Sequence, residues 1–354
     1  MRVVLVAGTT ATAEIEGISA AGSTPALISH TPSADSAILV YGRPVAPLGI
    51  QHPTPVSPTG CPTPAVISRA AHEVCGFDVT VVDAGLATPT GAPTVDLRTQ
   101  SDRRMNAEMR TEDAAAVYGG GDIREPVPVP DAAEIFERAR GLGGSIPGPL
   151  LVGETIPGGT TTALGVLRAL GHSFSVSSSF ADNPVSLKRR VVREGLEASG
   201  LAPGELDDPL DAVQTMGDPV LAASAGLTVG AIEAGTSVTL AGGTQMLTVG
   251  VLVRSLSDAP LSLATTSFVA DSVSDLSDAA NAFDLDLTVT DPEFTDSHVA
   301  MERYLAGEAK EGVAMGGVLA AAAGRVGGQT EQQLDAVRER IAVVYDRLLE
   351  DDGS

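Results

Sequence analysis

The sequence predicts an α/β fold, a doubly wound and mostly parallel sheet with helices on both faces, of the Rossmann-like kind. Short β-branched runs end in glycine or a carboxylate, and alanine-rich amphipathic stretches lie between them. Continuous apolar strands that alternate with amphipathic helices are typical of a parallel sheet covered on both faces. The 354 residues, 43% of them hydrophobic and 19% charged, suffice for one large domain.

The expected elements alternate along the chain. The strands are residues 3–7, 38–41, 79–82, 150–152 and 238–240. The helices are residues 65–74, 132–142, 163–170, 187–198 and 219–234. Two segments rich in proline or in proline, aspartate and glycine, residues 43–64 and 199–218, are expected to be loops. Ligands bind outside the carboxyl ends of the strands in such sheets, so we expect the site there.

A C-terminal helix is predicted next, because Thr330 and Gln333 have the spacing of a capping box. One apolar stripe follows, formed by Leu334, Val337, Ile341, Val344 and Leu348. This stripe fits either a helix packed on its own domain or a dimer seam. We expect residues 1–348 to form a single unit, with a small satellite subdomain from the terminal segments, and residues 349–354 to be a frayed tail.

The charge composition excludes some partners. The chain has 45 acidic and 22 basic residues, a formal net charge of −23, and Lys188 and Lys310 are its two lysines. Neutralising the phosphates of a nucleic acid requires basic patches, so a nucleic-acid partner is not expected. Abundant acids with almost no lysine indicate a protein that works at very high salt, where screening removes most of the self-repulsion.

The remaining composition predicts a cytoplasmic protein without a membrane or metal partner. No apolar run approaches the ~18 residues needed to span a bilayer, and the N-terminus lacks a signal-peptide pattern. Cys61 and Cys75 are 14 residues apart with no CxxC and no paired histidines nearby, so we interpret them as inert small side chains. Neither GxSxG nor a GxGxxG after a strand occurs.

Residues 153–162 read GETIPGGTTT and predict a strand, a loop and the start of a helix. Gly158 and Thr160 have the spacing of a phosphate-binding loop, but Gly159 stands where that loop has its lysine. A helix that starts at Thr161, with Thr160 as its N-cap, would offer free N–H groups to a phosphate monoester, and the glycines would allow close approach. The alternative is a tight turn that only requires glycine.

Other polar residues at strand or helix ends are candidates. Glu154 would repel an anion, so we interpret it as an acceptor for hydroxyls such as those of a ribose. Asp83 and Gly85 lie at a strand end and either touch a ligand or shape the turn. Asp218 starts a helix and is interpreted as its cap.

Five segments together resemble a known enzyme family. They are VVDAGL (81–86), NAEMRTEDA (106–114), GETIPGGTTT (153–162), GDPVLAASAGLTVGAIEAGTSVTLAGG (217–243) and EGVAMGGVLAAA (311–322). In this order they are similar to segments of the nicotinate-nucleotide–dimethylbenzimidazole phosphoribosyltransferases, which act in the assembly of the lower ligand of cobamides (vitamin B12). The resemblance covers residues 60–345 and is that of a divergent archaeal branch.

The resemblance implies a reaction and a set of residues. It implies transfer of a 5-phosphoribosyl group from nicotinate mononucleotide to a benzimidazole-type base, without a cofactor, by a homodimer. Glu311 aligns with the catalytic base, and its alternative interpretation is a glutamate at a helix N-terminus. Lys188 aligns with a lysine near the substrate phosphate, its alternative being a solvated helix face. The other residues implied at the substrate or phosphate are Glu154, Gly158, Gly159, Thr160, Thr161, Thr266 and Gly312, with Lys310 as a further possibility.

The departures from the family pattern leave alternatives open. Ile156 replaces a glycine, Gly159 an asparagine and Ala241 an aspartate, and Thr9-Thr10-Ala11 stands where the family has Asp-His-Gly. The first 60 residues match poorly, so their substrate contacts cannot be transferred. A non-catalytic nucleotide- or phosphosugar-binding module, or the same reaction with another acceptor base, remains an alternative at this point.

Overall fold

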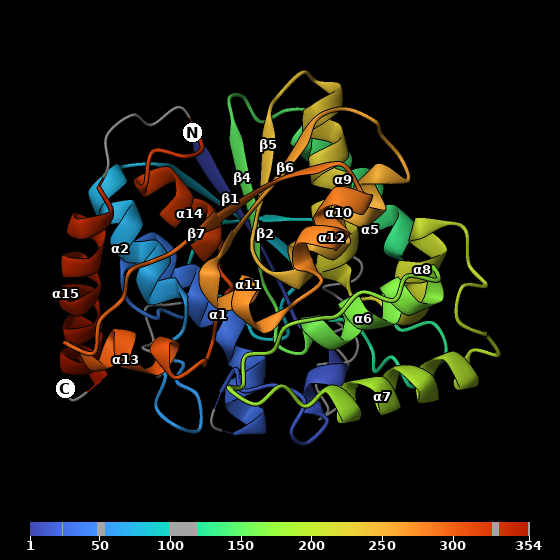
Figure 1. The fold of residues 1–354 in the computed structure, drawn as a ribbon, viewed down its shortest axis with the longest axis horizontal. Helices are drawn as coiled ribbons and strands as arrows, with labels where there is room; N and C mark the ends of the chain where they lie inside the picture. The colour runs from blue at the N-terminus through green and yellow to red at the C-terminus, as the bar shows by residue number, and fades with distance from the viewer. Residues whose placement is uncertain (23, 48–53, 99–118, 328–332, 353–354) are drawn as a thin grey trace.

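A seven-stranded, fully parallel sheet organises the chain (Figure 1). The computed structural model describes residues 1–354 except 23, 48–53, 99–118, 328–332 and 353–354. The strand order is β3-β2-β1-β4-β5-β6-β7, the order of a doubly wound sheet. The strands are β1 (Arg2–Gly8), β2 (Asp78–Gly85), β3 (Thr94–Asp96), β4 (Leu150–Thr155), β5 (Val238–Ala241), β6 (Leu261–Thr266) and β7 (Leu285–Thr290). The predicted fold class is confirmed.

Helices cover both faces of the sheet, and each face has its own hydrophobic core. One face carries α5 (Ala132–Gly143), α6 (Gly159–Ala169), α7 (Val185–Ala198), α8 (Pro209–Met216), α9 (Pro219–Glu233), α10 (Thr244–Arg254) and α12 (Leu276–Ala282). The other carries α1 (Pro25–Tyr41), α2 (Ala65–Cys75), α13 (Val299–Leu305), α14 (Met315–Ala322) and α15 (Leu334–Asp352). The 3-10 turn η1 (Ala11–Glu14) follows β1, and α11 (Ser267–Ser272) follows β6.

The prediction of a strand at residues 38–41 was wrong, because these residues end helix α1. Thr24 caps this helix by accepting from the amide of Leu27, and Pro25 is its first residue, where a missing N–H costs nothing. Gly42, with φ 75°, ends it. A short apolar run does not distinguish a buried strand from the last turn of a buried helix.

The predicted loop 199–218 also contains a helix, α8, which Asp208 caps through the amides of Leu210 and Asp211. Strands β3, β6 and β7 and helices α10 to α13 had no counterpart in the sequence prediction, whereas α14 is the helix expected after Glu311. The β6 and β7 sequences, LSLATT and LDLTVT, mix apolar with polar residues because these strands lie toward one edge of the sheet.

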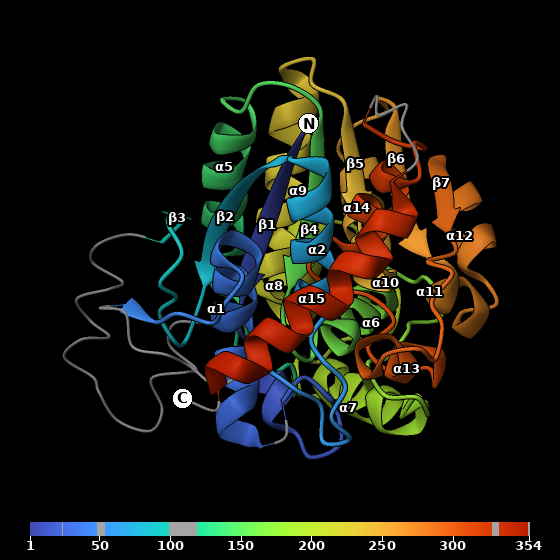
Figure 2. The same cartoon turned by 90° about the vertical axis from the view of Figure 1, so that its left-hand side faces the viewer.

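The sequence predicts a small satellite subdomain from the terminal segments; in the structure β1 lies inside the sheet, and α15 packs against α2 on one of its faces. Figure 2 shows α15 crossing in front of α2. The stripe Val337, Ile341, Val344 and Leu348 is fully buried there, so it packs within its own chain. The helix continues to Asp352, into the predicted tail, and Thr330 of the predicted capping box lies outside the described residues.

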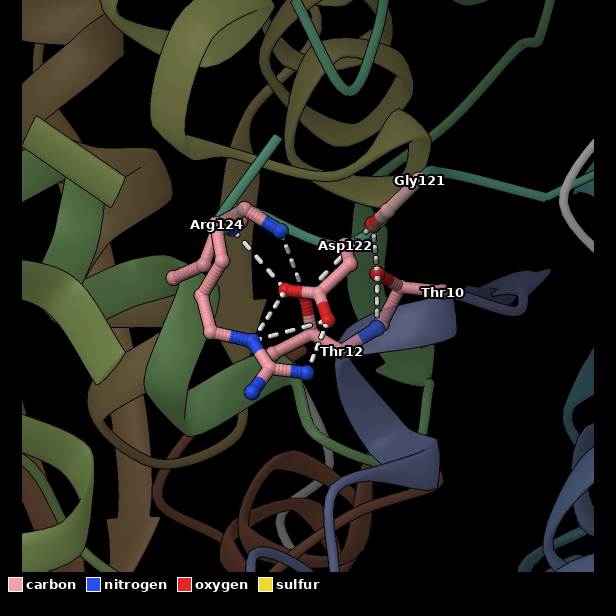
Figure 3. Close-up of polar contacts among 6 residues, drawn as sticks. Thr10, Thr12, Gly121, Asp122 and Arg124 are labelled. Atoms are coloured by element: carbon pink, nitrogen blue, oxygen red, sulfur yellow. Dashed lines mark hydrogen bonds and ion pairs between the residues drawn. The ribbon is translucent and has the colours of Figure 1, made fainter. Parts of the chain in front are cut away.

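Threonine hydroxyls hold the loop after β1 in place. Thr10 donates its hydroxyl to the carbonyl of Gly121 at 2.8 Å (Figure 3). The Thr12 hydroxyl accepts from the amide of Ile123 at 3.1 Å. Thr9 donates to the carbonyl of Gly85 at 2.8 Å. The segment Thr9-Thr10-Ala11 therefore connects β1 to its neighbours.

Among the described residues, no helix is both long enough and apolar enough to cross a bilayer.

Candidate functional site

A cavity lies outside the carboxyl ends of β4 and β5, on the side where the sequence predicts the site. Two of its walls are the GETIPGGTTT loop, residues 154–160, and residues 311–313 before α14. Residues 177–179 and 243–245 form a third wall. The remaining lining comes from residues 18–22, Thr31, Asp35, 55–57, 61–64 and Ala309. Segments that are far apart in the sequence thus meet around one hollow.

The start of α6 differs from the prediction by two residues. The helix begins at Gly159, and Gly158, with φ 78°, is its N-cap, so Thr160 is an interior residue rather than the cap. The Gly158 carbonyl accepts from the amide of Thr161 at 2.8 Å, which closes the first turn early. No side chain caps this turn, and the amide of Thr160 has no backbone partner among the described residues. The helix start is therefore open toward the cavity.

Lys188 lies behind that helix start. Its side chain is fully buried, so the interpretation as a solvated helix face was wrong. Its Nζ donates to the Thr160 hydroxyl at 2.8 Å and to the Ser177 carbonyl at 2.6 Å. Burial, and then the nearby Lys310, lower the pKa of Lys188 to about 7. Lys188 does not line the cavity itself and reaches it through the Thr160 hydroxyl.

Lys310 holds the neighbouring segment in the same way. Its Nζ donates to the carbonyls of Ser178 at 3.0 Å and Phe180 at 2.6 Å. The two lysines therefore fix residues 177–180, three of which line the cavity.

Glu154 and Glu311 face the cavity from opposite segments. The pKa of each carboxyl is raised to about 8, mainly by burial, and the nearby Asp218 and Glu311 contribute to the rise for Glu154. The Glu311 Oε1 accepts from the amides of Gly316 at 2.7 Å and Gly312 at 3.2 Å. In the part of the chain that the structure describes, its Oε2 has no partner within strict hydrogen-bond geometry, although the Thr266 backbone and the Thr265 hydroxyl lie close enough to act against the rise of its pKa. Glu311 therefore satisfies the start of α14 with one oxygen and leaves the other available.

The backbone around Glu311 is strained. Ala309, Lys310, Val313 and Ala314 have φ values of 56°, 44°, 52° and 63°, which are unfavourable for residues with a Cβ, and for a β-branched valine above all. Such strain persists only where the surroundings impose it, and it gathers at functional sites.

Three hydrogen bonds impose this conformation. The Val313 amide donates to the Glu154 carbonyl at 2.8 Å, and Ser68 donates to the Val313 carbonyl at 2.6 Å. Thr266 donates to the Lys310 carbonyl at 2.9 Å. Thr266 thus acts on the segment that carries Glu311 and does not itself line the cavity.

The other residues that the sequence predicts for the site differ in their distance from the cavity. Gly158, Gly159, Thr160 and Gly312 line the cavity, whereas Thr161 is buried beside it. Asp83 and Gly85 lie away from it.

Asp83 and Gly85 shape the turn after β2. Asp83 Oδ1 accepts from the amides of Gly85 and Leu86, both at 2.9 Å. Asp218 caps α9 through the Leu221 amide at 2.9 Å, as predicted.

Two functional candidates escaped the sequence analysis. Asp35, on α1, lines the cavity and accepts hydroxyls from Thr63 at 2.5 Å and Thr155 at 2.7 Å. Burial raises the pKa of its carboxyl to about 6. Gln245, the second residue of α10, also lines the cavity. Asp35 was missed because helix α1 was not predicted, and Gln245 because no local pattern marks it.

Cys61 also lines the cavity, but burial, then the charge of Glu308, raises the pKa of its thiol to about 12, so it is unreactive at neutral pH. Both cysteines are free thiols. Within the described ranges, no three His, Cys, Asp or Glu side chains gather into a metal-binding cluster.

Glu154→Gln is expected to stabilise the protein increasingly as the pH rises from about 4.5 to about 8. The pKa of Glu154 is about 8 in the folded chain against an ordinary 4.5, so between these values the folded chain keeps a proton that the unfolded chain has released. Stability then falls as the pH rises through this window, by about 1.4 kcal/mol per pH unit for one such group. Glutamine removes that loss. Urea unfolding at several pH values measures it, with the exposed Glu16→Gln as control, and parallel profiles for all three proteins would contradict the assignment.

We compared the chain with known proteins by sequence and by structure. No protein-family model matches the chain. A UPF0284 protein of Halobacterium salinarum is 53% identical over 351 residues, which are 97% of each chain. A UPF0284 protein of Methanosarcina mazei is 39% identical over 332 residues, 89% of this chain and 86% of that one.

Two solved structures from Thermus thermophilus share the architecture. A nicotinate-nucleotide-dimethylbenzimidazole phosphoribosyltransferase has a TM-score of 0.55 at 16% identity, over 99% of this chain and 84% of that one. A structure of CobT has a TM-score of 0.56 at 16% identity, over 97% and 83%. At this identity the likeness shows the fold alone.

Proposed function

We propose, from the premise that the chain belongs to the UPF0284 family, that it transfers a 5-phosphoribosyl group from nicotinate mononucleotide to a benzimidazole-type base. The products are nicotinate and α-ribazole phosphate. The observation that carries the proposal is that the open start of α6, Glu154 and Glu311 line one cavity. An anion site, an acceptor for hydroxyls and a poised base thus lie within reach of one small ligand.

The proposed chemistry needs one general base. The ring nitrogen of nicotinate is positively charged in the mononucleotide, so it leaves as a neutral base when its bond to C1′ breaks. One nitrogen of the acceptor forms the new bond to C1′, and the proton on the other ring nitrogen must be removed. Glu311 in its ionised form takes this proton, and a pKa of about 8 matches the work of a base near neutral pH.

The substrate fits the cavity by the chemistry of its walls. The phosphate lies at the start of α6, where the helix dipole and the Thr160 amide favour an anion and Lys188 supports the Thr160 hydroxyl. The ribose hydroxyls face Glu154. The aromatic base lies on the apolar wall formed by Pro55, Val56 and Pro64.

A non-catalytic nucleotide-binding module is the second candidate. The observation in its favour is the same raised pKa, because Glu311 is mostly protonated at neutral pH and cannot then accept a proton. The raised pKa of Glu311 does not distinguish between acceptor bases, so the same reaction with another base stays an alternative.

The test is incubation of the protein at high salt with nicotinate mononucleotide and dimethylbenzimidazole, followed by chromatography. We expect free nicotinate to form only when the acceptor base is present, and α-ribazole phosphate to form in equal amount. Tight binding of the mononucleotide without release would favour the second candidate. Repeating the reaction with several benzimidazoles and purines identifies the acceptor.

A further inference from the structure

Gln245 is a buried amide with an unused donor. Its side chain is 4% exposed, and among the described residues its Nε2 has no hydrogen-bond partner. Buried polar groups in folded proteins are almost always paired, because an unpaired one loses its hydration without compensation. The side chain lines the cavity, so a ligand atom is a natural partner for this donor.

The amide of Gln245 packs on Gly159. A Cβ at residue 159 would lie 2.0 Å from Nε2 and 2.4 Å from both Cδ and Oε1 of Gln245. The amide group therefore occupies the space that a side chain at residue 159 would use. Gly159 stands at the position where a phosphate-binding loop has its lysine.

The surroundings suit an anion in spite of the nearby acids. The starts of α6 and α10 lie at the cavity, and no side chain caps either of them in the described structure. The carboxyls of Glu154 and Glu311, with pKa values raised to about 8, are mostly neutral at pH 7 and do not repel a phosphate there.

We propose that Gln245 Nε2 donates a hydrogen bond to a phosphate oxygen of the ligand held at the start of α6. Gln245 thereby supplies, from α10, the side-chain donor that Gly159 does not provide. The inference rests on the proposed function in that both place the ligand's phosphate at this helix start, and it adds the residue that recognises it.

The test compares ligands with and without the phosphate. Calorimetry on the full chain measures the binding of nicotinate mononucleotide, nicotinate riboside and inorganic phosphate. Gln245→Met keeps the size of the side chain and removes the donor. We expect it to weaken the mononucleotide and inorganic phosphate by roughly tenfold or more and to leave the riboside unchanged. Gln214→Met, a half-buried glutamine on α8, is the matched control and should change neither.

A second variant tests the packing. Gly159→Ala places a Cβ against the Gln245 amide and should cause the same selective loss of phosphate affinity by displacing it. Equal mononucleotide affinity in Gln245→Met, or an equal loss for the riboside, would overturn the role of Gln245. If Gln245→Met binds the mononucleotide with unchanged affinity and releases nicotinate normally, only the role of Gln245 is refuted. If the unaltered protein binds neither phosphate nor the mononucleotide, the proposed function is refuted as well.

Discussion

Glu311→Gln is expected to lower kcat by about 10²–10⁴-fold, the usual contribution of a general base. Glutamine keeps the shape of the side chain and its place at the start of α14, but it cannot take the proton of the acceptor base. The Oε1 atom can still accept from the amides of Gly312 and Gly316, so the segment should stay in place. Nicotinate release under saturating substrates measures the effect.

Binding and pH dependence separate this role from a structural one. Affinity for nicotinate mononucleotide should remain within a few-fold, because the base acts only on the second substrate. In the unaltered protein kcat/KM should rise with pH and level off above about 8, since the ionised form of Glu311 is the active one. The variant should lose this rise, and Glu302→Gln, an exposed glutamate on α13, should keep it. Normal turnover in Glu311→Gln would remove this residue from the mechanism.

Local sequence patterns were sufficient for the centre of the sheet. The runs at residues 3–7 and 150–152 are continuous, apolar and followed by glycine, and they form β1 and β4. The run at residues 38–41 has the same composition but belongs to α1, because the helix is specified upstream by Thr24 and Pro25. The signals that separate the two cases lie well upstream of the run itself.

The site was partly visible for a similar reason. The glycines and Thr160 of residues 153–162 have a recognisable spacing, and Glu311 carries the resemblance of residues 311–322. The dry surroundings of Glu311 favour a raised pKa for that carboxyl, but the rise for Glu154 has no local signal, since its cause is burial by other segments.

Asp35 and Gln245 have no such spacing. Asp35 reaches the cavity because Thr63 and Thr155 meet around it, and Gln245 because α10 starts beside α6. Such juxtapositions are tertiary and leave no local pattern. Lys188 shows how far the sequence reaches. It was a candidate because lysine is rare in the chain, but its fully buried position behind Thr160 depends on the tertiary fold.

Gly153→Val is expected to lower both stability and turnover. Gly153 lies in β4, and a Cβ there would lie 2.4 Å from the Ala314 Cβ, 2.7 Å from its Cα and 2.8 Å from its amide nitrogen. Two of these atoms are backbone in a strained segment, so they cannot move aside cheaply. Overpacking of this kind costs about 1–3 kcal/mol or more of the free energy of unfolding. Denaturant titration measures the stability, and nicotinate release at saturating substrate measures the turnover.

The loss of turnover should exceed what partial unfolding explains, because the displaced residues are the ones that position Glu311. The Val313 amide donates to the Glu154 carbonyl, next to Gly153 in β4, so a valine at residue 153 pushes on the contact that joins the two carboxyl-bearing segments. Gly141→Ala, in α5, where an added Cβ meets nothing within 4 Å, should lower neither quantity. Gly153→Val could instead remain folded at the assay temperature and turn over normally. The placement of Glu311 would then not matter, and its role as a positioned base would be refuted.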